Sequence, residues 1–113
     1  LQRDCLLVAR AQRGDMTQRE ELRRIIRTST NSGIRWAGLR AFTSHGTPDD
    51  IPFLEQVART DPLGIDLTEA RRQLAPEVLA MNVPDPAADV YYPIRTHAEQ
   101  LSRQIKSRAD RAP

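Results

Sequence analysis

Cysteines, aromatic residues and long apolar runs are all scarce in this sequence of 113 residues. Its single cysteine, Cys5, excludes an internal disulfide framework and a zinc cluster built on cysteine. The same scarcity is compatible with a reducing compartment, which favours the cytoplasm. The longest strongly apolar run, residues 5–9, is far shorter than the roughly 18 residues that cross a bilayer, so we expect no membrane partner. With aromatics at 4%, the core must consist mainly of Leu, Ile, Val and Ala.

Residue patterns that indicate catalysis or metal binding are equally scarce. The two histidines, His45 and His97, belong to no HExxH or CxxC pattern, and Cys5 lies in an apolar run that predicts a buried, inert thiol. The acidic pairs at 20–21 and 49–50 fall in the first turns of predicted helices, where carboxylates stabilise the positive end of the helix dipole. No GxSxG elbow and no Gly-rich phosphate loop occurs. We therefore expect no enzymatic activity, no cofactor and no metal site.

The sequence does contain internal similarity at a spacing of 32 residues. Gly14 and Gly46 stand at this spacing, and each follows an apolar helical pattern, where glycine suits a helix C-terminus. The same offset relates further identical residues: Arg3 and Arg35, Leu7 and Leu39, Ala9 and Ala41, Leu22 and Leu54, Arg27 and Arg59, Thr28 and Thr60. Similarity at a fixed period of this length is typical of a helical repeat.

Apolar periodicity predicts helices at about residues 3–13, 17–28, 33–45 and 48–60. The third of these is apolar on two flanks, so it should lie between neighbours, with Trp36 packed between units. The fourth has a single apolar stripe and can cover its partner from outside. This pattern predicts antiparallel helix pairs.

The second half of the chain is less regular. A helix should begin near Leu67 and be interrupted by Pro76, and a Pro-rich connector should span residues 82–90. A last helix is predicted from near Pro93, with one apolar stripe formed by Ile94, Ala98, Leu101 and Ile105. Residues 107–113 are expected to fray, and no strand is predicted anywhere.

Charge is segregated along the chain, although the net charge is only +2. Residues 1–48 carry nine Arg against four acids, residues 49–99 four Arg against ten acids, and residues 100–113 three Arg and one Lys against one Asp. Segregation of this kind can steer a partner. One helix carries four arginines close together, which could contact phosphates or simply form a solvated face: Arg19, Arg23, Arg24 and Arg27. Tyr91 and Tyr92 are further candidates for partner contacts, or could anchor the connector.

Residues 33–62 resemble a HEAT repeat of the bacterial, lyase-associated type. The features that carry the resemblance are an Arg followed by a small residue, a Gly that ends the first helix, and a Thr-Pro-acid turn, here Arg35, Gly38, Gly46 and residues 47–49. The resemblance extends to residues 3–29, and residues 94–101 are similar to the first helix of another unit. A strict 32-residue register would instead make residues 66–81 that first helix and residues 93–108 the second, with the Pro-rich connector as an insertion. It implies an all-α fold, an α-solenoid of about three antiparallel helix pairs within one domain spanning 1–113. The units would be about 3–29, 33–61 and 66–108.

For function, the resemblance implies a binding module and supplies no catalytic motif. We expect a non-catalytic scaffold or protein-interaction module, whose partner is another protein or another domain of the same chain. Two alternatives are a nucleic-acid binder that uses the arginines of residues 19–27, and an accessory domain of a larger enzyme. Because the chain begins with Leu1 rather than Met, we expect it to be a fragment or the terminal part of a larger protein.

Overall fold

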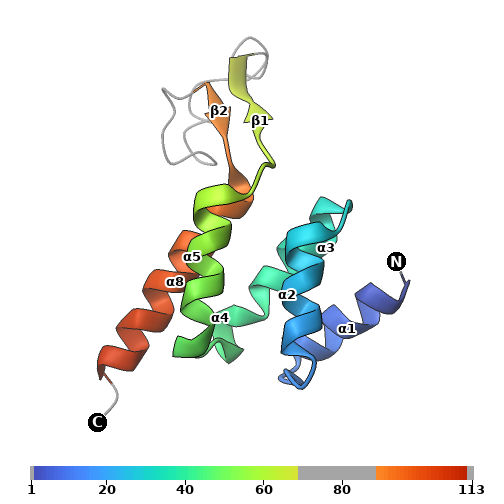
Figure 1. The fold of residues 1–113 in the computed structure, drawn as a ribbon, viewed down its shortest axis with the longest axis vertical. Helices are drawn as coiled ribbons and strands as arrows, with labels where there is room; N and C mark the ends of the chain where they lie inside the picture. The colour runs from blue at the N-terminus through green and yellow to red at the C-terminus, as the bar shows by residue number, and fades with distance from the viewer. Residues whose placement is uncertain (1, 69–88, 112–113) are drawn as a thin grey trace. The chain divides into compact units, whose positions relative to one another are not determined.

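The computed structural model describes residues 2–68 and 89–111, and these residues are mostly helical, which confirms the all-α class (Figure 1). The chain divides into two compact units. The first comprises residues 1–61 and 94–113, and the second comprises residues 62–93. The residues expected to form a third repeat, 66–108, are therefore shared between the two units.

Within its described residues, the first unit contains helices and the loops that join them, and no strand. Its helices are α1 (Gln2–Gln12), α2 (Arg19–Thr28), α3 (Ser32–Arg40), the short α4 (Phe42–His45), α5 (Ile51–Thr60) and α8 (Pro93–Arg111), the last belonging here from Ile94 onward. Gly14 follows the end of α1, as the sequence predicts, and has a φ of 105°. A glycine suits this position because other residues rarely adopt a positive φ.

The predicted helix 33–45 is divided at Ala41. The Ala41 backbone N–H donates to the Gly38 carbonyl, three residues back, which tightens the chain into a turn between α3 and α4. A single continuous helix was therefore wrong at this point. The predicted helix 48–60 likewise begins with a 3-10 turn, η1 (Pro48–Asp50). Pro52 has no N–H with which to bond the carbonyl of Pro48, so the tighter bond from Ile51 to Pro48 takes its place.

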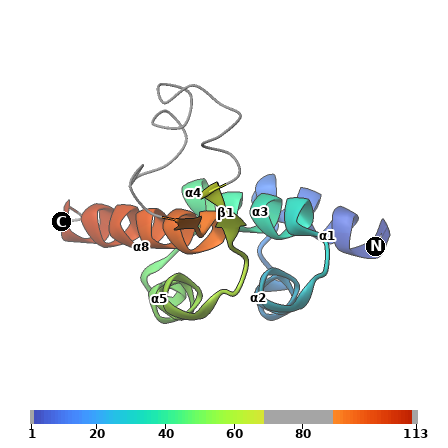
Figure 2. The same ribbon diagram turned by 90° about the horizontal axis from the view of Figure 1, so that it is seen from above.

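Two layers of helices make up this unit (Figure 2). Helices α1, α3, α4 and α8 lie in one layer, and α2 and α5 lie in the other. The core between them is aliphatic, as the composition predicts, with Phe42 its largest fully buried side chain. Leu22, Ile26, Leu39 and Leu54 are at most 1% exposed. The alternation of layers along the chain means that each second-layer helix is covered by first-layer helices that precede and follow it.

Helix α8 carries the predicted apolar stripe. Ile94, Ala98, Leu101 and Ile105 are all buried, with 2% exposure or less. The expected fraying of residues 107–113 was wrong as far as Arg111, since the helix continues to that residue. Arg108 Nη1 donates to the Thr43 carbonyl of α4 at 2.7 Å and fastens this end of the helix.

The second unit contains a short antiparallel pair of strands, β1 (Ile65–Asp66) and β2 (Val90–Tyr91). The expectation that the chain has no strand was therefore wrong for these four residues. Ile65 pairs with Tyr91 and Asp66 with Val90. The partners are far apart in sequence, so no hairpin turn marks them. The predicted interruption at Pro76 and most of the connector 82–90 lie outside the described residues.

In the part of the chain that the structure describes, no helix combines the length and the apolar character needed to cross a membrane.

Candidate partner-binding surface

Two of the candidate arginines converge on one buried carboxylate. Arg19 Nη1 lies 2.6 Å from Asp50 Oδ2, and Arg23 Nη2 lies 2.7 Å from Asp50 Oδ1. The Asp50 side chain is 0% exposed, whereas those of Arg19 and Arg23 are 25% and 18% exposed. A buried carboxylate is tolerated only when charges and hydrogen bonds compensate it, and both guanidiniums do so here. This cluster joins α2 to the start of α5.

Asp50 also closes the turn that precedes α5. Its Oδ2 atom accepts a hydrogen bond from the Thr47 backbone N–H at 2.8 Å, and the Thr47 side chain accepts from the backbone N–H of Asp50, which completes a capping box. One carboxylate therefore starts a helix and holds its neighbour. Sequence analysis assigned residues 49–50 to the start of a helix, with Thr47 as its cap, and missed the link to α2.

The other two arginines have different surroundings. Arg24 donates from both Nε and Nη2 to Glu21 Oε1, one turn earlier on α2, and this hydrogen bond holds the pKa of Glu21 below its usual value and raises the pKa of Arg24. The Arg27 guanidinium lies over the Phe53 ring of α5, 5.8 Å from its centroid. Arg23 lies over the same ring at 5.6 Å.

The four arginines thus share α2 but do not form a surface free of acids. Asp50 and Glu20 both lie against Arg23, whose Nη1 donates to Glu20 Oε1 at 2.9 Å. Phosphate contact by these residues stays a prediction. A phosphate would have to compete with carboxylates already in place for most of the available donors.

A second junction between successive helices centres on Arg35, which the sequence did not single out as a contact. Arg35 of α3 is buried, donates from Nε to the Ile26 carbonyl of α2, and forms an ion pair with Asp61 at the end of α5. Burial lowers the pKa of Arg35, but a guanidinium beside a carboxylate stays charged at neutral pH. Arg95 of α8 donates from Nε to the Asp61 carbonyl at 2.6 Å.

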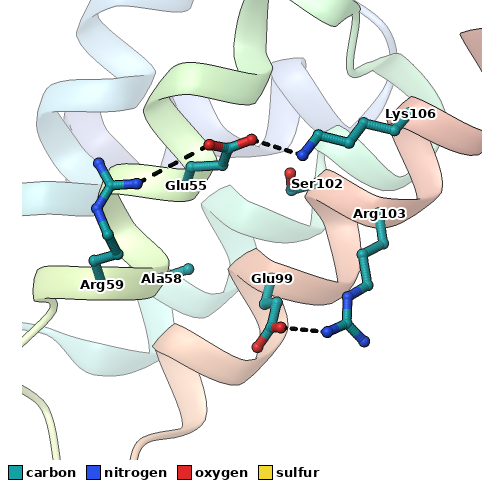
Figure 3. A pocket seen from close by; sticks show the side chains of 7 residues that line it. All are labelled: Glu55, Ala58, Arg59, Glu99, Ser102, Arg103 and Lys106. Carbon is teal, nitrogen blue, oxygen red and sulfur yellow. Dashed lines mark hydrogen bonds and ion pairs between the residues drawn. The ribbon is translucent and has the colours of Figure 1, made fainter.

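A groove lies between α5 and α8 on the surface of the first unit (Figure 3). It has a volume of about 370 Å³ and is open to solvent. Its seven lining residues alternate in charge around two small side chains: Glu55, Ala58 and Arg59 from α5, and Glu99, Ser102, Arg103 and Lys106 from α8. No single short motif of the sequence predicts this groove, because α5 and α8 are far apart in the chain.

The charges of this groove are organised into pairs. Lys106 Nζ lies 2.8 Å from Glu55 Oε1, and Arg59 Nη1 lies 4.0 Å from the other oxygen of Glu55. The hydrogen bond from Lys106, together with its charge, lowers the pKa of Glu55. Arg103 Nη2 lies 2.5 Å from Glu99 Oε1 along α8. Figure 3 shows the Lys106–Glu55 pair joining α8 to α5, and the Arg103–Glu99 pair along α8, with no bond drawn to Ser102.

The remaining residues of interest lie apart from the groove. Cys5 is exposed, so the expectation of a buried thiol was wrong: α1 turns Leu7, Val8 and Ala11 to the core and Cys5 away from it. Trp36 is 38% exposed, and its ring centroid lies 4.3 Å from that of His97 on α8. Burial, and secondarily the charge of Arg40, lowers the pKa of His97.

The tyrosines at 91 and 92 belong to the second unit and are half-buried there. Among the described residues, no cluster of His, Cys, Asp and Glu side chains could hold a metal ion. His45, at the end of α4, instead lies with its Nε2 atom 3.2 Å from the Gln12 carbonyl.

What the described geometry provides chemically is a set of fixed charges on a helical frame. Comparison with protein-family models, with curated proteins and with solved structures finds no match to this chain.

Proposed function

We propose that this chain is a HEAT-like helical-repeat module that binds another protein, or another domain of its own parent chain, without catalysis. The observation that carries the proposal is a junction that occurs twice. Arg35 of α3 donates to a carbonyl in the last turn of α2, and Arg95 of α8 donates to the carbonyl of the residue that follows α5. In both cases a first-layer helix binds the C-terminal end of the preceding second-layer helix, where a cation also complements the helix dipole.

This repeated junction favours one of the two alignments of the third helix pair of the repeat. It matches Arg95 with Arg35 and Ile94 with Ile34, so α8 corresponds to the first helix of a unit rather than the second. The buried positions agree, since Ile34, Gly38 and Phe42 are buried in α3 and α4, and Ile94, Ala98 and Ser102 are buried in α8. The α-solenoid remains our proposal, with α1 and α2, then α3–α4 and α5, then α8, as its successive members.

A repeat frame of this kind suits binding because its surface side chains are held in place before the partner arrives. The Asp50 and Arg35 clusters join helices that are adjacent in space, and preorganised groups lose less conformational entropy on association. The charged rim around the groove between α5 and α8 is of the polar kind found in transient interfaces. An accessory domain of an enzyme would use the same surface toward its catalytic domain.

Nucleic acid is the less favoured ligand. Asp50, Glu20 and Glu21 each lie against one or more of the arginines of α2, and a carboxylate at a phosphate site opposes binding. Within residues 2–68 and 89–111, no exposed aromatic side chain is found in contact with these arginines, since Phe53 is buried beneath Arg23 and Arg27.

The proposal is tested by affinity capture with the folded chain immobilised, in extract of the cells that express it, treated with nuclease. A matched control is Leu54→Asp, which places a charge at a fully buried position and unfolds the frame. We expect a protein that is retained by the wild type, is lost with the control and survives nuclease. Retention of nucleic acid alone, confirmed by salt-sensitive fluorescence anisotropy with a labelled duplex, would replace this function with the nucleic-acid alternative.

A further inference from the structure

The residues that line the groove between α5 and α8 suit the binding of a charged helix. Its floor is made by small side chains, Ala58 and Ser102, and Ser102 is only 4% exposed. Long charged side chains stand around this floor on both helices (Figure 3). On α8 the lining residues recur at helical spacing, at 99, 102, 103 and 106, and on α5 they do so at 55, 58 and 59. Side chains at this spacing share one face of each helix, so the two rows line the groove between them, and the Lys106–Glu55 pair bridges it.

The groove carries three cations and two acids, and on average its cations are the more exposed side chains. The side chains of Arg59, Arg103 and Lys106 are 67%, 77% and 53% exposed, whereas those of Glu55 and Glu99 are 39% and 55% exposed. Both acids are already paired with cations of the groove itself. Arg19 and Arg23 are 25% and 18% exposed and bond the buried Asp50, whereas the groove cations are more than half exposed and bond acids at the surface. A guanidinium has five N–H donors, so some remain for an incoming carboxylate.

The chain contains its own example of such an arrangement. Helix α5 and the turn before it begin with Asp49 and Asp50 and lie against the arginines of α2. The basic first section of the sequence therefore receives the acidic start of the following helix. Residues 100–113 are again basic, with three Arg and one Lys against one Asp, and they include three of the four α8 residues that line the groove, the fourth being Glu99.

We propose that the groove between α5 and α8 binds an α-helix of a partner protein that presents carboxylates along one face. This inference rests on the proposed function and names the chemistry of the partner. The carboxylates of the partner helix bind Arg59 on one side and Arg103 and Lys106 on the other. Its backbone approaches the small floor at Ala58, because a larger residue there would hold the incoming helix away.

The direct test uses a defined probe: a fluorescein-labelled, alanine-based peptide of about 18 residues with glutamate at every fourth position, long enough to form a helix in water. Fluorescence anisotropy is measured with the full chain at low and at physiological salt. We expect binding that weakens with salt, because these cations are exposed and screened. The same peptide with glutamine in place of glutamate should bind at least about tenfold more weakly, since it removes each carboxylate partner.

Two variants locate the site. Arg59→Glu combined with Arg103→Glu should weaken binding by about tenfold or more, whereas Arg10→Glu combined with Arg13→Glu, which changes the net charge equally at exposed sites elsewhere, should leave it unchanged. Ala58→Gln alters no charge but fills the floor, and it should also weaken binding. Circular dichroism of each variant verifies that the helices remain. If both groove variants bind the acidic peptide as the wild type does, the inference is wrong.

Other occupants give different results. A wild-type chain that sediments as a dimer, and becomes a monomer with the groove variants, would show that a second copy fills the groove. Equal binding of the glutamate and glutamine peptides would show that carboxylates are not recognised. The two proposals fail separately. A captured protein still retained by the Arg59→Glu, Arg103→Glu variant overturns this inference and leaves the proposed function standing, whereas absence of any captured protein overturns the proposed function.

Discussion

At the scale of single residues, the most consequential side chain described above is Asp50. It is fully buried, and it accepts from two guanidiniums and from the backbone of Thr47. Its position after the Thr-Pro turn could be recognised from the sequence, but its partners could not. Arg19 precedes it by 31 residues, and only tertiary packing brings the two together.

Replacement of Asp50 by alanine should lower the free energy of unfolding by about 2–4 kcal/mol, because two partly buried guanidiniums lose their counter-charge and the helix loses its cap. Urea denaturation followed by circular dichroism measures the loss. The matched control is Asp49→Ala at the exposed neighbouring position, for which we expect a change within about 0.5 kcal/mol. Equal effects of the two substitutions would contradict the role assigned to Asp50.

Arg35 and Asp61 should be energetically coupled. Both are buried, with 6% and 5% exposure, and they form an ion pair between α3 and the end of α5. In a double-mutant cycle of Arg35→Gln and Asp61→Asn, each single substitution should be strongly destabilising, and the coupling energy should be about 1–3 kcal/mol. Additive losses would show that the two side chains stabilise the fold independently.

At the scale of helices, the close approach of α2 and α3 depends on Gly38. A Cβ atom at this position would lie 2.9 Å from Ile26 Cγ1, closer than packed side chains come, and 3.4 Å from Leu22 Cδ1. Glycine is otherwise unfavourable in a helix interior, by about 1 kcal/mol relative to alanine. Its presence in α3 therefore reflects packing rather than helix propensity.

Gly38→Ala should consequently destabilise the protein, by about 1–2 kcal/mol, despite the better helix propensity of alanine. Thermal unfolding followed by circular dichroism decides the sign. Gly33→Ala in the first turn of the same helix is the comparison, because an added Cβ there meets only the Asn31 side chain, at 3.2 Å. A stabilised Gly38→Ala protein would mean that α2 and α3 separate easily.

Helices were the part of this fold that the sequence predicted best. The stripe of Ile94, Ala98, Leu101 and Ile105 predicted both the start of α8 and its buried face, because periodicity records which side faces the core. The break at Ala41 was missed, since no Pro or Gly stands there and the turn arises from a backbone hydrogen bond. The strand pair was missed because its partners lie far apart in sequence.

At the scale of the whole molecule, the sequence predicted the arginines as a set but not the surface they form. Arg19, Arg23 and Arg27 share one helix face, which the spacing of four residues establishes. Whether such a face meets solvent, phosphate or protein depends on what lies opposite. Here the opposite side holds Asp50 and Phe53, so part of the face belongs to the interior of the first unit. The groove between α5 and α8 also depends on tertiary packing, because the two helices that line it are far apart in sequence.

The acid sensitivity of the folded chain should contain a contribution from His97. Burial and the charge of Arg40 lower its pKa in the folded state, below the value near 6.5 of an unfolded chain. The unfolded state therefore binds the proton more readily. The stability gained from neutral His97 is present above the unfolded pKa and is lost as the pH falls through the folded pKa.

Thermal unfolding at pH 7.5 and at pH near 5.5 measures this effect, in a range where Asp and Glu side chains stay ionised. We expect the wild type to lose stability toward the lower pH, and His97→Phe, which keeps an aromatic ring against Trp36, to lose less. An identical slope in both proteins would remove His97 as a source of acid sensitivity.

The contact between Trp36 and His97 also makes the molecule observable without any label. Trp36 is the one tryptophan of the sequence, so all tryptophan emission originates at a single point where α3 meets α8. A ring centroid 4.3 Å away places the imidazole against the indole, so loss of α8 or a charge on His97 changes the surroundings of this one fluorophore. Intrinsic fluorescence consequently reports, from one site and in real time, whether α8 is seated and whether His97 carries a proton.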